Sequence, residues 1–160
     1  MVSKFLNCNK ILEELDMSFC SLDEKAGSLI GKGLRGNRNL QTVSLKGNPL
    51  KGSIKEIAKA FDVNKKALSI KNLDLSKCQI ECDHITEEFT DMIKSDFTTL
   101  KVLNLRDNFL KWKSADRIKD ALKHNKTITK ILLDYNPIKK HIIQQIESLC
   151  KRNQMLDEIN

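Results

Sequence analysis

Hydrophobic positions recur along this chain in a line of eleven residues that appears five times. The line reads Leu-x-x-Leu-x-Leu-x-x-(Asn/Cys)-x-Leu, with other aliphatic residues replacing some leucines and mostly polar residues at x. Its copies begin at Leu12, Leu40, Ile70, Leu100 and Ile128, so the spacing is 28, 30, 30 and 28 residues. The alternation of apolar and polar positions predicts a short strand with one buried face. A fixed period of this length is typical of proteins built from stacked repeats.

Each predicted strand is followed by a stripe of apolar residues at helical spacing, with Lys, Glu and Asp between them. Each unit is therefore predicted to be strand, turn, helix and return loop. The five stripes are Ala26, Leu29, Ile30 and Leu34; Ile54, Ile57, Ala58 and Phe61; Ile85, Phe89, Met92 and Ile93; Ala115, Ile118 and Leu122; Ile142, Ile146 and Leu149.

This alternation of strand and helix predicts a parallel sheet with right-handed crossovers. Strands lie about 4.8 Å apart, whereas packed helices need about 8–10 Å, so the helical side is expected to be wider. We therefore predict the α/β class, as a right-handed α/β solenoid bent into a horseshoe arc. The parallel β-sheet would line the concave face and the helices the convex face.

Residues 1–160 are predicted to form a single domain of about five full repeats with partial repeats at both ends. At the N-terminus, Leu6-x-x-Asn9-x-x-Leu12 matches the tail of a repeat, and at the C-terminus Leu156-x-x-Ile159 predicts the start of a sixth strand. Neither end carries the polar cap that solenoids usually have. The chain is thus either a segment of a longer protein or has ends that stack on a partner or a second copy.

The return segments carry a second shared pattern, Gly33-Leu34-x-x-Asn37-x-x-Leu40 and Ala121-Leu122-x-x-Asn125-x-x-Ile128. With the 28–30-residue period, this pattern resembles the ribonuclease-inhibitor-like subclass of leucine-rich repeat proteins. Similar repeats occur in the sensor ends of nucleotide-oligomerisation-domain receptors, in Ran GTPase-activating proteins and in actin-capping tropomodulins. The resemblance covers essentially the whole chain. It implies the leucine-rich-repeat horseshoe but names no partner, because the family's motif residues are structural.

Solvent-facing positions between the buried leucines are expected to form rows along the concave face. One row is Asp16, Ser44, Asp74, Asn104 and Leu132; beside it lie Glu14, Thr42, Asn72, Val102 and Lys130; the strand-exit position holds Phe19, Gly47, Lys77, Asp107 and Tyr135. Repeat proteins use their concave faces as binding surfaces, and aromatic and arginine anchors are the usual energetic centres of an interface. The predicted partner-binding residues are Asp16, Phe19, Lys46, Asp74, Arg106, Phe109, Trp112 and Tyr135. For Phe19 and Phe109, packing between neighbouring turns is the alternative.

The cysteines favour a structural interpretation. They are five in number and lack a disulfide spacing, and Cys20 and Cys78 occupy the asparagine slot of the repeat, where we expect buried thiols. Reduced thiols favour a reducing, cytoplasmic compartment. Cys78-x-x-x-Cys82-x-His84 matches no zinc spacing and lacks a fourth ligand. We predict no metal, no cofactor and no small-molecule substrate, and, without a phosphate loop or a nucleophile with its base, no enzyme activity.

The formal net charge of +7 favours acidic partners. On the predicted helices, however, the basic residues are interleaved with acidic ones. Base-stacking aromatics are absent from those helices apart from Trp112 at an edge, which argues against nucleic acid. No apolar run is long enough to span a membrane.

The predicted function is a non-catalytic protein–protein interaction scaffold that binds a partner through its concave strands and strand-exit loops. One alternative is a regulator of a small GTPase, for which Arg106 with Asn104 and Asp107 is the cluster to test. The other is a structural segment of a larger cytoskeletal or sensor assembly. The Lys-, Asn- and Ile-rich composition indicates an AT-rich genome, and a source in an intracellular pathogen would imply delivery into the host cell.

Overall fold

The computed structural model of this chain describes residues 1–61, 68–95 and 99–159. Within them, five parallel strands form one sheet in chain order: β1 Glu14–Asp16, β2 Thr42–Ser44, β3 Asn72–Asp74, β4 Val102–Asn104 and β5 Lys130–Leu132. The register pairs Leu15, Val43, Leu73, Leu103 and Ile131 in one row. The α/β class, the parallel sheet and the two predicted rows of strand residues are confirmed.

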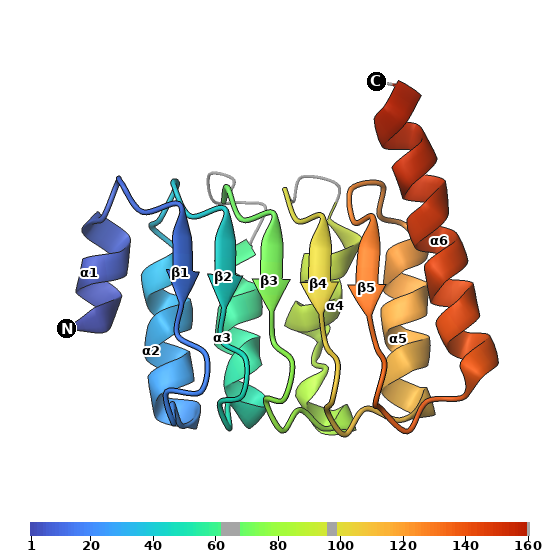
Figure 1. The fold of residues 1–160 in the computed structure, drawn as a ribbon, viewed down its shortest axis with the longest axis horizontal. Coiled ribbons are helices and arrows are strands. Elements are labelled where there is room, and N and C mark those ends of the chain that lie inside the picture. Colours follow the sequence, from blue (N-terminus) through green and yellow to red (C-terminus); the bar gives the residue numbers. More distant parts are fainter. Residues whose placement is uncertain (62–67, 96–98, 160) are drawn as a thin grey trace.

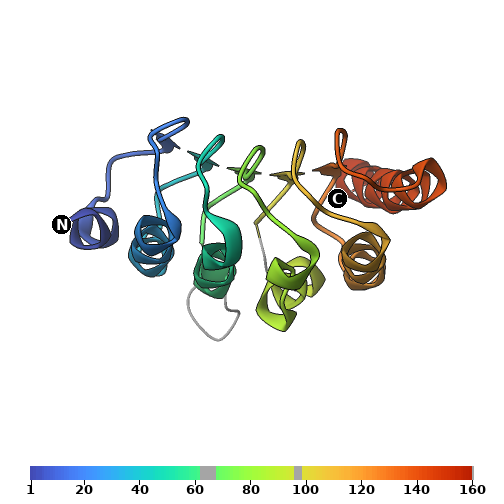
Figure 2. The same ribbon diagram turned by 90° about the horizontal axis from the view of Figure 1, so that it is seen from below.

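Six α-helices accompany these strands in the described part of the chain. They are α1 Val2–Cys8, α2 Glu24–Leu34, α3 Ile54–Ala58, α4 Glu87–Lys94, α5 Trp112–Lys123 and α6 Lys140–Ile159, with 3-10 turns η1 Lys51–Ser53, η2 Lys59–Phe61 and η3 Cys82–His84. Helices α1 to α5 form one layer on one side of the sheet, and α6 lies at the end of the stack beside β5 (Figures 1 and 2). The chain passes between the two layers in every repeat.

The core lies between the two layers. Leu45, Leu75 and Leu105, which directly follow β2, β3 and β4, are fully buried, as are the helix residues Ile57 and Ile118. Burying one such side chain contributes roughly 1.5–3 kcal/mol, so neighbouring repeats stabilise one another through this shared interior.

Buried asparagines connect each repeat to the one before it. The Asn108 Oδ1 accepts hydrogen bonds from the backbone N–H groups of Cys78 and Ile80, at 2.9 and 3.0 Å. Its Nδ2 donates to the carbonyl oxygens of Leu75 and Leu105, both at 3.0 Å. One side chain thereby satisfies turn groups of two repeats that burial would otherwise leave without partners.

The two prolines lie in the turns that are not bonded by an asparagine side chain of a following repeat. Pro49 follows Asn48, and the next repeat offers the thiol of Cys78, which donates to the Leu45 carbonyl oxygen. The Leu50 N–H therefore bonds the Asn48 carbonyl oxygen within its own turn, at 2.7 Å. The turn around Pro137, in the fifth and last of the described strand repeats, closes in the same way. Proline is compatible with this turn because the closing bond is donated by the residue after it, so the N–H that proline lacks is not needed.

The first repeat corrects one prediction about cysteine. Cys20 is exposed, although it occupies the same slot as the buried Cys78. Side chains in this slot bond backbone groups of the preceding repeat, as the Asn48 Nδ2 does with the Met17 carbonyl oxygen at 2.8 Å. In the described residues no strand precedes β1, so Cys20 has no neighbour to enclose it.

The C-terminus corrects a second prediction, because the expected sixth strand is helix. Residues 140–159 form α6 without interruption. Asn153 keeps the bonds of a return loop while lying within this helix, since its Nδ2 donates to the Ile128 carbonyl oxygen at 2.9 Å. The neighbouring Arg152 donates to the carbonyl oxygens of Leu122, Lys123 and Asn125 at the end of α5. These contacts satisfy the last carbonyls of α5 and join α6 to it.

Two helical stripes were predicted imperfectly. Ile85 is buried but lies before α4, because η3 occupies residues 82–84 and delays the start of the helix. Leu29 was placed on the apolar stripe of α2 and is 44% exposed. The tail of a repeat predicted at the N-terminus is present as α1, and the Asn9 Oδ1 accepts from the Leu12 N–H at 2.8 Å.

Candidate protein-binding surface

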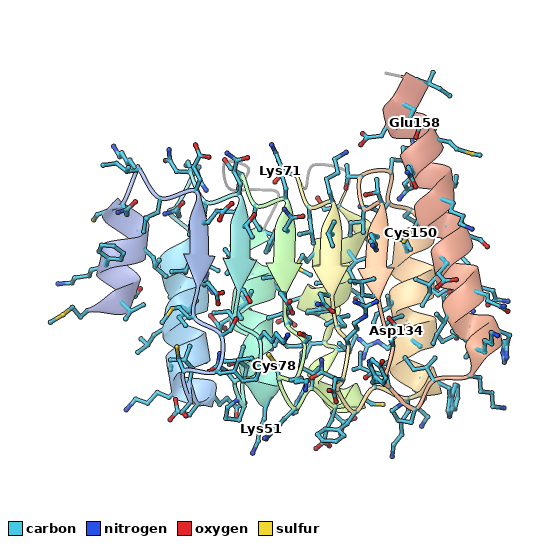
Figure 3. All side chains as sticks on the ribbon, in the orientation of Figure 1. Lys51, Lys71, Cys78, Asp134, Cys150 and Glu158 are labelled. Atoms are coloured by element: carbon cyan, nitrogen blue, oxygen red, sulfur yellow. The ribbon has the colours of Figure 1, made fainter. Side chains whose placement is uncertain are left out.

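The residues that leave each strand share an unusual backbone conformation. Phe19, Gly47, Lys77, Asp107 and Tyr135 have φ between 54° and 70°, the left-handed region. The N–H groups of the first four bond carbonyl oxygens of the following repeat at 2.8–3.0 Å, and these bonds fix the conformation. The strands therefore end in one rigid row, which we call the strand-exit edge; in Figure 3 it lies on the side where Lys51 and Asp134 are labelled, opposite Lys71.

The solvent-facing side chains of the sheet, the strand face, bond one another across the strands. Ser18 and Ser44 lie 2.7 Å apart, and the Asn104 Nδ2 donates to Asp74 Oδ2 at 3.0 Å. The Arg106 Nε donates to Asp134 Oδ2 at 2.5 Å. A partner binding here would have to displace these bonds, which reduces the gain from new polar contacts.

Of the predicted charged residues, Asp74 and Arg106 belong to this network. Asp16 lies at the exposed end of the same row, where hydrogen bonds from Ser18 hold its pKa below the ordinary value. Asp74 accepts from the Ser76 hydroxyl at 2.6 Å. The structure therefore places these predicted residues on one face, with Asp74 and Arg106 occupied by neighbours within the chain.

Phe19 and Lys46 form a pair at the first two exit loops. The Lys46 Nζ lies 5.7 Å from the Phe19 ring centroid, within the range of a cation–π contact. A Cβ on Gly47 would come within 2.3 Å of the Phe19 ring, so the ring packs on this glycine. Phe19 therefore packs between neighbouring turns, which was the alternative to partner binding in the sequence analysis, and it is still 63% exposed.

Phe109 and Trp112 line a cleft on the strand-exit edge. The cleft has a volume of about 610 Å³ and is completed by Pro137, Lys111, Lys113, Glu81, Cys82 and Asp83. Phe109 is 55% exposed and Trp112 56%, and the Lys113 Nζ lies 5.7 Å from the Trp112 ring centroid. Tyr135 is 81% exposed on the adjacent loop, beside Arg106 and Asp134. The predicted residues Phe109, Trp112 and Tyr135 thus gather at the last two exit loops.

The lysines of the helix layer and of these loops differ in their partners. On the helices, Lys119 pairs with Asp116 at 2.5 Å and Lys123 with Asp120 at 2.7 Å. Lys55 pairs with Glu88 at 3.0 Å, and the hydrogen bond from Lys55 lowers the pKa of that carboxyl to about 2. In the exit loops, Lys77 pairs with Asp107 at 3.3 Å. In the described residues no carboxylate forms an ion pair with the other lysines near these loops, Lys51, Lys111, Lys113, Lys139 and Lys140.

A second groove lies between α6 and the end of the sheet. It has a volume of about 790 Å³ and mixed charge, with Lys130 and Lys151 near Glu147 and Asp157. The Lys101 Nζ reaches Asp157 of α6 at 2.6 Å. The groove is therefore bridged by an ion pair between the sheet and the helix that covers its edge.

Within residues 1–61, 68–95 and 99–159, no three His, Cys, Asp or Glu side chains come together as a metal site. Among the helices the structure describes, none is both long and apolar enough to cross a membrane. Burial raises the pKa of Cys78 to about 12 and that of Cys150 to about 11, so neither thiol is a nucleophile at neutral pH.

Sequence reasoning missed Lys139, Lys140 and Pro137 as members of a surface. The signal was present: neither lysine has an acidic residue three or four positions away, unlike the lysines of α5. Pro137 was assigned to the turn, and only the three-dimensional packing of loops brings it beside Trp112.

No protein-family profile matches the chain, and no curated protein sequence matches it. Among solved structures, it is similar to the leiomodin-1 actin-binding site 2, with 13% identity and a TM-score of 0.76 over 98% of this chain and 89% of the other. It is also similar to the tropomodulin C-terminal domain of Caenorhabditis elegans, with 9% identity and a TM-score of 0.53 over 99% of this chain and 93% of the other. These domains have leucine-rich-repeat-like α/β folds, and the chain shares that fold.

Proposed function

We propose that this domain binds actin and acts as a non-catalytic, protein-binding part of a cytoskeletal assembly. One observation carries the proposal: the likeness to a leiomodin domain described as an actin-binding site extends over 98% of the chain at a TM-score of 0.76. Such coverage includes both terminal helices as well as the five strands. A general interaction scaffold with another protein partner is the broader form of the same proposal.

We further propose the repeat geometry of the fold. We assign the chain to a right-handed leucine-rich-repeat arc of the ribonuclease-inhibitor-like subclass, forming one domain. The repeat spacing of 28–30 residues and the one-to-one strand register support it. A rigid arc would present a preorganised surface that loses little conformational entropy on binding.

We also propose that the domain has no catalytic activity. The alternative of GTPase regulation depends on Arg106, whose guanidinium already pairs with Asp134 and is 43% exposed. An arginine that acts on a nucleotide would have to leave this ion pair. We therefore favour binding without chemistry, in the cytoplasm, over GTPase regulation.

The test is direct binding to actin. The purified chain is incubated with filamentous actin and sedimented, and binding to monomeric actin is measured by calorimetry. We expect saturable binding that persists at physiological ionic strength. Lysozyme, a basic protein of similar size, serves as the control for attraction by charge alone. Binding no stronger than that of lysozyme, to both forms of actin, would overturn the proposed function.

A further inference from the structure

Exposed aromatic side chains are concentrated at one place on this molecule. Within the described residues, four of the five exposed aromatics lie on the strand-exit edge, the fifth being Phe5 of α1. Three of the four, Phe109, Trp112 and Tyr135, belong to residues 107–113 and 135–140, which we call the exit patch. Tryptophan and tyrosine are the residues most enriched at energetic centres of interfaces.

The exit patch is also basic. It contains four lysines, Lys111, Lys113, Lys139 and Lys140, against one carboxylate, Asp107, which pairs with Lys77 at 3.3 Å. None of the four forms an ion pair in the part of the chain described, so their charge is available to a partner. The helix layer, in contrast, neutralises many of its lysines internally.

The walls of the cleft are held in place before any partner arrives. The Phe109 N–H bonds the Ile80 carbonyl oxygen at 2.8 Å, and the Leu110 N–H bonds Asn136 Oδ1 at 3.0 Å. The buried Ser114 hydroxyl bonds the Lys111 carbonyl oxygen at 2.8 Å. Because three successive repeats are joined here, an apolar group entering beside Trp112 would meet a surface that needs little reordering.

The charges around the cleft define an orientation. Glu81 and Asp83 line it from the third repeat, whereas Lys139 and Lys140 follow Pro137 on the fifth. The part of a partner that enters the cleft beside Glu81 and Asp83 should be uncharged. Its acidic groups should lie on the side of Lys139 and Lys140. The complement of this surface is therefore an apolar side chain flanked on one side by carboxylates.

We infer that the exit patch docks an acidic protein segment whose apolar anchor enters the cleft between Phe109, Trp112 and Pro137. This inference rests on the proposed function, because it names the surface on which actin, as the proposed partner, would dock. It places binding energy in the exit loops of the fourth and fifth repeats and not on the strand face.

Trp112 is the only tryptophan in the chain, so it reports on this cleft alone. The full chain is labelled with 5-fluorotryptophan and observed by ¹⁹F NMR during titration with a random glutamate–tyrosine copolymer. We expect the single resonance to shift with saturation, and poly-glutamate, which lacks the anchor, to bind about tenfold more weakly. Heparin tests whether the site accepts any polyanion.

Two matched charge reversals locate the site. K139E/K140E changes the patch without touching the reporter, and placing acidic residues in the first turn of α6 suits its dipole. K4E/K25E changes two exposed lysines of α1 and α2 that have no ion pair in the described residues. We expect K139E/K140E to weaken copolymer binding about tenfold, and K4E/K25E to remain within about twofold of wild type.

The inference is overturned if the copolymer leaves the Trp112 resonance unmoved, if both reversals weaken binding equally, or if heparin binds as tightly as the copolymer. Titration with unlabelled monomeric actin separates this inference from the proposed function. Actin that binds by calorimetry without moving the resonance overturns the patch as the docking site and leaves actin binding intact. A copolymer that binds while actin does not overturns the proposed function and leaves the chemistry of the patch intact.

Discussion

Replacing Asn108 by alanine should remove a buried link between two neighbouring repeats. Asn108 is 3% exposed, and its carboxamide serves the N–H groups of Cys78 and Ile80 and the carbonyl oxygens of Leu75 and Leu105. A protein hydrogen bond contributes about 1 kcal/mol net, and an orphaned buried group costs at least as much. Four hydrogen bonds are lost and three of the four groups are left without a partner, since the Leu105 carbonyl oxygen keeps its bond from Asn136 Nδ2. We therefore expect the free energy of unfolding to fall by about 4 kcal/mol. That is a large part of the roughly 5–15 kcal/mol that stabilises a typical domain.

The assay is urea unfolding followed by far-UV circular dichroism. With an m-value of about 2 kcal/mol/M, the midpoint should move down by about 2 M. Asn136→Ala is a graded control, because Asn136 is partly exposed and serves only one N–H group, that of Leu110; we expect a loss of about 2 kcal/mol. Cys20 occupies the same slot of the first repeat but is exposed, so Cys20→Ala should change the free energy of unfolding by less than about 0.5 kcal/mol. Equal losses in all three variants, or a loss below about 1 kcal/mol for Asn108→Ala, would refute the reasoning.

Four other predictions follow from the same structure. Gly31→Ala should cost about 1–3 kcal/mol in urea unfolding, because its Cβ would lie 2.5 Å from the Glu56 carbonyl carbon; Gly52→Ala, which meets only the flexible end of Glu24, should cost less, and the reverse order would be wrong for this packing. Glu88→Gln should lower stability at pH 7, and the deficit should vanish as the pH falls from about 4.5 to about 2, since the folded pKa of Glu88 is depressed; a deficit independent of pH would contradict the Lys55 pair. In native protein, iodoacetamide should modify Cys8 and Cys20 but leave Cys78 and Cys150 unreacted until urea unfolds the chain, as measured by mass spectrometry. Lysine should not substitute for Arg152, because one ammonium group cannot reach the three carbonyl oxygens that the guanidinium bonds. Hydrogen exchange of α6 should therefore be faster than in wild type in both Arg152→Lys and Arg152→Ala. An exchange rate in Arg152→Lys equal to that of wild type would contradict this docking of α6.

The strands and their register could be predicted because one residue in two is buried and the line repeats five times. A shift of one residue would turn every leucine of a copy to solvent, so the rows through Asp16 and Glu14 were fixed by the pattern. The ends could not be predicted in this way. Leu156 and Ile159 match the start of a strand, but they belong to α6, which Arg152 and Asn153 join to the end of α5 and the loop that follows it.

The candidate site could likewise be predicted only in part from the sequence. Trp112 and Tyr135 were found from residue type, since aromatics at strand exits have no core position to fill. The pairing of Asp74 with Asn104 and of Arg106 with Asp134 depends on side-chain geometry across neighbouring strands. On the strand face, Asp74 and Arg106 already have partners within the chain. In the exit loops, Lys139 and Lys140 form no ion pair within the described residues, which favours these loops as the binding surface.

Hydrogen–deuterium exchange of the chain with and without monomeric actin is the direct test of actin docking at the exit patch. Docking there predicts protection in peptides covering residues 107–113 and 135–140, with little change in the helix layer around α2 and α3. A complex that protects the helix layer and leaves both exit loops unchanged would contradict the docking surface. Unchanged exchange throughout the chain, at actin concentrations that saturate a leiomodin domain measured in parallel, would contradict actin binding itself.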